Sequence, residues 1–235
     1  MFIHNKKVLV VATLLLLVNV VLTLFSKTIK LPFLNIINTA AMFLFFLPYA
    51  KKKYAFLLGF SFLLLSSFCF WDYENSILRL GLHTFRSIAN IFFIIHIYPK
   101  QKILLHNKFE LYPIITIVVL LNLYVIYNIN DLVNYYTGVI KYSSVGIFSL
   151  GISHILLATL TFLFHYTTDK IPKYFMLFVA LYIVSDIFNI LGYSFKFCWF
   201  YVLNRILYIL SLYFLICHAH NLTKTTKNNC DVLSP

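Results

Sequence analysis

Residues 173–193 read KYFMLFVALYIVSDIFNILGY, an apolar run that polar side chains interrupt mainly near its far end, at Ser185, Asp186 and Asn189. A helix of roughly 20 residues spans about 30 Å, which is the thickness of the hydrocarbon core of a bilayer. A surface helix of a soluble protein would instead carry a charged face toward water. The run therefore predicts a membrane-spanning helix with a few polar side chains at one depth.

The composition extends this prediction to the whole chain. Of its 235 residues, 61% are hydrophobic and only 11% are charged, whereas an ordinary soluble domain has about 25% charged residues. The mean hydropathy is +0.87. A soluble enzyme of this size needs more polar residues to cover its surface, so that class is excluded. The apolar runs are continuous, unlike the alternating strands of a transmembrane β-barrel.

Seven more apolar runs have a length close to that of a membrane span: 8–25, 31–50, 54–71, 77–98, 111–128, 144–166 and 197–220. The sequence thus predicts an all-α membrane protein, a bundle of about eight transmembrane helices forming a single polytopic domain over residues 1–220. The more polar stretch 129–143 is predicted to be an interfacial loop or short helix. Residues 221–235 are predicted to be a polar, frayed cytoplasmic tail.

The lysines between the runs predict the orientation. With eight spans, 12 lysines fall on the side of the two termini and 4 on the other side, while the three arginines fall within or at the edge of spans. Cytoplasmic loops carry the excess of basic residues, so both termini are expected in the cytoplasm, in a bacterial inner membrane. The net charge of +12 is explained by loops that meet anionic headgroups, and no nucleic-acid partner is expected.

Polar side chains inside the spans are the informative positions, because an ionisable group in hydrocarbon needs an internal partner. Asp186 is the only acid well inside any run. Three groups of polar residues share helical spacing or lie close together: Tyr182, Ser185, Asp186 and Asn189 in one run, Arg79, His83, Arg86 and Asn90 in a second, and Asn204 with Arg205 in a third. The first two groups predict polar stripes on their helices.

Depth connects these groups. At a rise of 1.5 Å per residue, Asp186, Arg86 and Arg205 are expected within roughly 5–8 Å of one another along the membrane normal. One reading is a buried Asp–Arg pair that only orients helices. The other is a hydrated binding site, in which two arginines for one acid leave positive charge for a lipid phosphate. The second reading predicts a substrate-binding group made of Arg86, Arg205, Ser185, Asn189, Tyr182 and Asn204.

Metal sites and cofactors are not expected. His83, His96 and His154 are each more typical of hydrogen-bonded residues between helices, and carboxylates that could complete a metal site with them are scarce. The four cysteines form no CxxC pair, which argues against zinc or iron–sulfur ligation. Cys69 and Cys198 fall near the same predicted membrane face, so either a disulfide or two free thiols is compatible with the sequence.

Three stretches resemble the YhhN-like lysoplasmalogenases, a family of eight-span membrane proteins of about this length. LYIVSD, residues 181–186, resembles that family's apolar Ser-Asp motif in the penultimate span. NIFFIIHIY, residues 90–98, resembles the end of its fourth span, and YFLICH, residues 213–218, the Tyr-rich end of its last. The resemblance implies a membrane lysolipid as partner and hydrolysis of the vinyl ether bond of lysoplasmalogens, which releases an aldehyde and a glycerophospho-headgroup.

One departure bears on activity. The family usually has a Gly-Asp after an FSLL-like run in the third span, but here residues 60–67 contain no acid. The chemistry needs a proton donor and a base. The resemblance implies Asp186 as base, Arg86 or Arg205 as its cationic partner, and His96 or His83 as a substitute acid. Three alternatives stay open: an inactive relative, a non-enzymatic protein that binds or transports a small amphiphile, and a structural or assembly factor.

Overall fold

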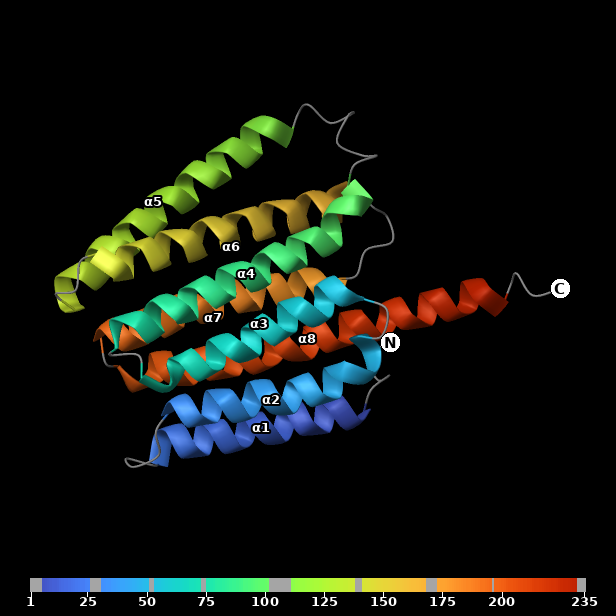
Figure 1. Ribbon diagram of the computed structural model, residues 1–235, viewed down its shortest axis with the longest axis horizontal. Coiled ribbons are helices and arrows are strands. Elements are labelled where there is room, and N and C mark those ends of the chain that lie inside the picture. Colours follow the sequence, from blue (N-terminus) through green and yellow to red (C-terminus); the bar gives the residue numbers. More distant parts are fainter. Residues whose placement is uncertain are drawn as a thin grey trace.

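The computed structural model describes residues 6–25, 31–50, 53–72, 75–101, 111–137, 141–167, 173–195 and 197–231. These residues are almost entirely helical and include no strand (Figure 1). The helices are α1 (Lys6–Phe25), α2 (Leu31–Ala50), α3 (Tyr54–Cys69), α4 (Ser76–Gln101), α5 (Leu111–Thr137), α6 (Lys141–Thr167), α7 (Lys173–Phe195) and α8 (Cys198–Asp231), with a 3-10 turn η1 (Phe70–Asp72) after α3.

Eight helices in the described part of the chain are long and apolar enough to cross a membrane. Their outer faces carry large exposed apolar side chains such as Leu17, Leu44 and Leu120, which is where lipid-facing residues belong. Successive helices run in opposite directions, so α1 begins and α8 ends on the same side of the bundle (Figure 1). The arrangement is consistent with a multi-pass integral membrane protein.

The structure differs from the predicted elements in two places. The interfacial stretch 129–143 is mostly regular helix, because α5 continues to Thr137 and α6 begins at Lys141. Val133 is buried there beside Ile147 and Ile190, and this packing holds the polar segment in the helix. The predicted frayed tail is also wrong up to Asp231, where α8 ends. No glycine or proline stops that helix, and residues 232–235 lie outside the described range.

Aromatic side chains from α2, α3, α4 and α7 form the main core. The ring centroids of Phe46 and Phe60 are 4.8 Å apart, and those of Phe93 and Phe178 are 5.1 Å apart. Gly59 allows α3 to approach α4, because a Cβ atom at this position would lie 2.7 Å from Cε1 of Phe93. Small residues give such close helix contacts in membrane proteins, so this half of the bundle is tightly packed.

Helix α5 is the loosest part of the bundle. It packs chiefly against α6 and α7, and most of its described side chains are exposed, including Leu121 and Tyr124. Figure 1 shows α5 at the edge of the bundle, diverging from α6 toward its own N-terminal end. The bundle therefore has one wall that few contacts hold in place.

Polar pairs also join helices away from the core. Asn19 of α1 and Asn38 of α2 exchange two side-chain hydrogen bonds of 2.9 Å, which satisfies four polar groups that lipid could not. Cys69 is a free thiol, in agreement with the second of the two alternatives for it. The side chain of Cys198 lies outside the described residues.

Candidate functional site

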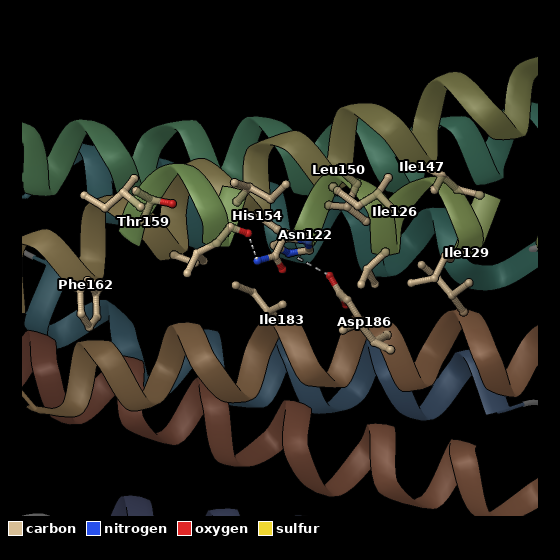
Figure 2. A pocket seen from close by; sticks show the side chains of 18 residues that line it. Asn122, Ile126, Ile129, Ile147, Leu150, His154, Thr159, Phe162, Ile183 and Asp186 are labelled. Atoms are coloured by element: carbon tan, nitrogen blue, oxygen red, sulfur yellow. Dashed lines mark hydrogen bonds and ion pairs between the residues drawn. The ribbon is translucent and has the colours of Figure 1, made fainter. Parts of the chain in front are cut away.

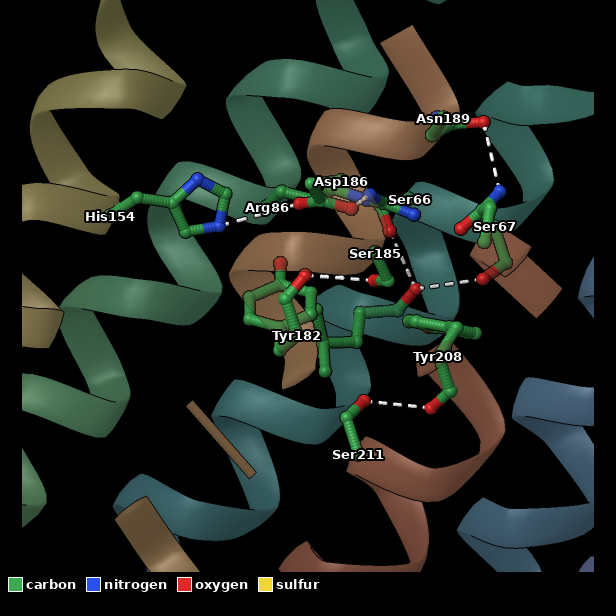
Figure 3. A network of polar contacts seen from close by, with 12 residues as sticks. Ser66, Ser67, Arg86, His154, Tyr182, Ser185, Asp186, Asn189, Tyr208 and Ser211 are labelled. Carbon is green, nitrogen blue, oxygen red and sulfur yellow. Dashed lines mark hydrogen bonds and ion pairs between the residues drawn. The ribbon is translucent and has the colours of Figure 1, made fainter. Parts of the chain in front are cut away.

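Asp186 of α7 lies between two basic side chains from different helices. Nη1 of Arg86, on α4, forms an ion pair with Oδ1 of Asp186. On the other side, Nε2 of His154, on α6, is 3.3 Å from Oδ2 (Figure 3). Asp186 is only 3% exposed, and a buried carboxylate is tolerated when a cation such as the guanidinium of Arg86 balances its charge. One acid thus joins α4, α6 and α7.

Two tyrosine rings complete the surroundings of Arg86. Its guanidinium carbon is 6.0 Å from the ring centroid of Tyr182 and 5.6 Å from that of Tyr208, distances at which a cation is attracted to an aromatic face. The hydroxyl of Tyr208 lies 3.2 Å from that of Thr39, which lies 2.9 Å from that of Ser67. Arg86 is therefore fixed by an ion pair and by two rings, one of which is itself anchored.

Tyr182 also contacts the histidine. Its ring stacks on Phe178 at 5.6 Å, and its centroid is 5.2 Å from that of His154 in an edge-on arrangement. The Tyr182 hydroxyl is buried and has no hydrogen-bond partner among the described residues. A buried donor of this kind is available to an oxygen atom of a ligand.

The remaining predicted substrate-binding residues take structural positions. The Ser185 hydroxyl donates to the Tyr182 carbonyl at 2.8 Å, within its own helix. Asn204 donates to Asn189 at 3.2 Å and so ties α8 to α7. The guanidinium of Arg205 lies over the ring of Phe70 at 5.7 Å. The predicted polar stripes thus meet in the bundle, and Arg86 is the arginine that pairs with Asp186.

The predicted acids His83 and His96 are placed differently. His83 is buried where α4 meets α6, since a Cβ atom on Gly146 would lie 3.0 Å from its Cδ2. His96 lies ten residues from Arg86 on the same helix, about 15 Å along its axis. Its ring is 4.1 Å from that of Phe56 and 5.9 Å from that of His218. The structure does not bring His96 to Asp186.

The sequence pattern predicts His154 to be an ordinary histidine between helices, whereas the structure places it beside Asp186. A depth estimate links Asp186 to the arginines. Applied to the run 144–166, that estimate places His154 at the middle of its span, close to the predicted level of Asp186. Depth was therefore the signal that could have found it.

Asp186 and His154 both line an elongated cavity between α5, α6 and α7 (Figure 2). Its volume is about 280 Å³, and most of its wall is formed by aliphatic side chains such as Ile126, Leu150 and Ile183. Four lining residues carry polar side chains: Asn122, His154, Thr159 and Asp186. An apolar pocket with a few convergent polar groups is the usual form of a small-molecule site.

His154 and Asp186 can perform acid–base chemistry on a molecule in the cavity, because a histidine and a carboxylate can exchange a proton between them. Among the described residues, no three side chains of His, Cys, Asp or Glu are grouped so that they could hold a metal ion. In the part of the chain that the structure describes, the buried acid is Asp186, and the buried arginines are Arg79, Arg86 and Arg205. The site therefore offers one carboxylate, one histidine and a cationic surrounding.

No family model, curated protein or solved structure matches this chain.

Proposed function

We propose that the protein is a membrane-embedded hydrolase of ether lysolipids that cleaves the vinyl ether bond of a lysoplasmalogen-like substrate. The observation that carries this proposal is the arrangement of Asp186, which pairs with Arg86 on one side and with His154 on the other. Asp186 and His154 also line an apolar cavity of a kind that suits a lipid chain. The resemblance to the YhhN-like family supports the same substrate class.

The proposed reaction uses His154 as the acid and Asp186 as the base. When the pair of His154 and Asp186 has taken up a proton from water, His154 passes that proton to the vinyl carbon remote from oxygen, which leaves an oxocarbenium ion at the carbon bonded to oxygen. Water adds to that carbon and loses a proton to Asp186. The resulting hemiacetal breaks its bond to the glycerol oxygen. Its hydroxyl proton is lost and the glycerol oxygen gains one in exchange, which releases an aldehyde and the glycerophospho-headgroup. Proton transfer across the 3.3 Å contact between Oδ2 and Nε2 restores the pair.

In this proposal His154 takes the part that the missing second carboxylate would have played. Arg86, in contact with Asp186, supplies the positive charge that faces this carboxylate. The non-polar wall limits water to what the reaction consumes.

A non-enzymatic protein that binds or transports a small amphiphile is the second candidate. It is favoured by one observation: Asp186 is the only carboxylate among the lining residues, and the rest of the wall is nearly all apolar. In that case Asp186, Arg86 and His154 would hold a ligand without cleaving it. The two candidates differ in whether a bound vinyl ether lysolipid is consumed.

The test is to incubate the purified protein with lysoplasmalogen and measure aldehyde release. We expect release by the wild type, and a loss of about 100-fold or more in Asp186→Asn, the usual size of a general acid–base contribution. A folded wild type that binds the lysolipid but releases no aldehyde would exclude the hydrolase and leave the second candidate.

We also propose that both termini face the cytoplasm of a bacterial inner membrane. The support is the asymmetry of 12 lysines to 4 between the two sets of loops. Reporter fusions at Lys53 and Asn228 should give the same cytoplasmic signal, and a fusion at Lys141 the opposite one. A periplasmic signal at Asn228 would contradict the eight-span topology.

A further inference from the structure

The cavity extends well beyond the Asp186–His154 pair. Its lining positions on α5 recur on one face of the helix from Ile115 to Ile129, a length of about 21 Å at 1.5 Å per residue. The lipid chains of one leaflet fill half of a hydrocarbon core of about 30 Å. The cavity is therefore long enough to take most of an extended lipid chain.

Its volume fits a single chain. An apolar cavity of about 150 Å³ holds one benzene molecule, so 280 Å³ corresponds to roughly a dozen carbon atoms at the same density. The Asn122 amide, one of the few polar lining groups, already donates to the carbonyl of Val118 at 2.7 Å. Away from Asp186 and His154, the wall thus offers mainly hydrocarbon contacts.

The reactive pair divides the cavity into two parts. Toward Phe162, α6 contributes Ala158 and Thr159 to the wall, and toward the other end it contributes Ile147, Leu150 and Gly151. Helix α5 also diverges from α6 in the direction of Phe162 (Figure 1). Figure 2 shows His154 and Asp186 between these two parts, so the part toward Phe162 begins at the reactive pair.

We propose that this cavity binds the hydrocarbon chain of a lysolipid lengthwise, along α5 past His154 and toward Phe162, and that the chain enters from the bilayer past α5. Lateral entry follows from the exposed and loosely packed state of α5, because a lipid chain then never has to cross water. The inference rests on the proposed function for the identity of the lysolipid, and it assigns the binding site of that lysolipid's chain.

The experiment uses the full chain in liposomes and a non-cleavable probe, a saturated alkyl-ether lysophosphatidylcholine with a diazirine near the end of its chain. After illumination, the labelled peptides are mapped by mass spectrometry. Two variants fill the cavity from opposite walls, Val118→Trp on α5 and Ala158→Phe on α6. Their matched controls, Leu121→Trp and Leu156→Phe, carry the same new side chains on exposed positions of the same helices that do not line the cavity.

We expect labelling of residues 115–125 and 155–162, and a loss of about tenfold or more in both filled variants, since the new side chain occupies space that the lipid chain needs. The controls should stay within about twofold. Labelling spread evenly over lipid-facing residues, or unchanged in folded Val118→Trp, would overturn the inference. If Ala158→Phe fails to fold, Val118→Trp decides, because α5 has room to accommodate it.

The probe separates this inference from the proposed function. Its ether bond cannot be hydrolysed by the vinyl ether reaction, so labelling does not depend on catalysis. Mapped labelling without aldehyde release from lysoplasmalogen would support the chain site and refute only the hydrolase. Aldehyde release that persists in both filled variants would refute only the chain site.

Discussion

Helices α4 and α5 both have the length and hydropathy of a membrane span, but they lie in opposite surroundings. In the apolar stretch of α4, 44% of the residues are buried, against 11% in that of α5. α4 carries Arg79, His83, Arg86 and Asn90 into the bundle, while α5 presents mainly aliphatic side chains to lipid and to the cavity.

This difference shows that the two sides of the bundle have different roles. Polar side chains on α4 are held by partners on neighbouring helices, as Asn90 is by Ser153 at 2.9 Å, so the tight half fixes the geometry of charged groups. The loose wall leaves space beside them. A site that is rigid on the charged side and open on the hydrocarbon side suits a lipid substrate, because only its reacting atoms need accurate placement.

The largest effect should come from Asp186→Asn, at the border of the two regions. The change leaves Arg86 buried without its counter-charge, which costs about 3–5 kcal/mol when a buried pair is broken. Unfolding in detergent should show this loss in the free energy of unfolding. The double variant Asp186→Asn with Arg86→Gln should recover more than half of it. Aldehyde release should stay absent in the double variant. A single variant with normal stability and normal activity would remove both roles of Asp186.

Truncating one large apolar side chain in the tightly packed core and one on α5 compares the packing of the two regions directly. Phe60→Ala, in the core against Phe46, should lower the free energy of unfolding by about 3 kcal/mol or more. Leu121→Ala on α5, a side chain that is 59% exposed, should change it by less than about 0.5 kcal/mol. Denaturant titrations of both variants in one detergent measure the difference. Equal effects would mean that α5 is packed as tightly as α3.

Two glycines give a finer comparison. A Cβ atom would lie 2.7 Å from Phe93 at Gly59, and 2.5 Å from Ile126 at Gly151. We expect Gly59→Ala to cost about 1–3 kcal/mol, since the core cannot move aside. Gly151→Ala should cost less than about 1 kcal/mol, because α5 can shift and Ile126 can change its rotamer. The melting temperatures of the two variants test this, and the reverse order would contradict a loose α5.

The smallest effect is expected at the polar pair between α1 and α2, far from the cavity. Asn38→Leu removes both hydrogen bonds with Asn19, and side-chain hydrogen bonds between membrane helices contribute about 0.6 kcal/mol on average. A stability loss near 1 kcal/mol with unchanged aldehyde release is the expected result. A loss of activity here would show that the site depends on α1 and α2.

Most of the fold could be predicted because a continuous apolar run whose length matches the thickness of a bilayer can hardly form anything but a membrane-spanning helix. The C-terminal ends of α5 and α8 could not be predicted from polar composition. The packing of Val133 keeps the end of α5 helical, and α8 contains no glycine or proline that would end it earlier. At the site, depth alone predicted that Asp186 lies near the level of Arg86 and Arg205, but not which of the two arginines pairs with it. The partner on α6 was not predicted, because which helices are neighbours decides whether His83, His96 or His154 reaches the acid.

The most direct test compares two histidines in the same assay. His154→Gln and His96→Gln make the same chemical change, one beside Asp186 and the other in the aromatic cluster around Phe56. With lysoplasmalogen as substrate, we expect aldehyde release to fall by about 100-fold or more in His154→Gln and to stay within a few-fold of wild type in His96→Gln. Full activity in a folded His154→Gln, or a loss confined to His96→Gln, would contradict the pairing of His154 with Asp186 as the reactive centre.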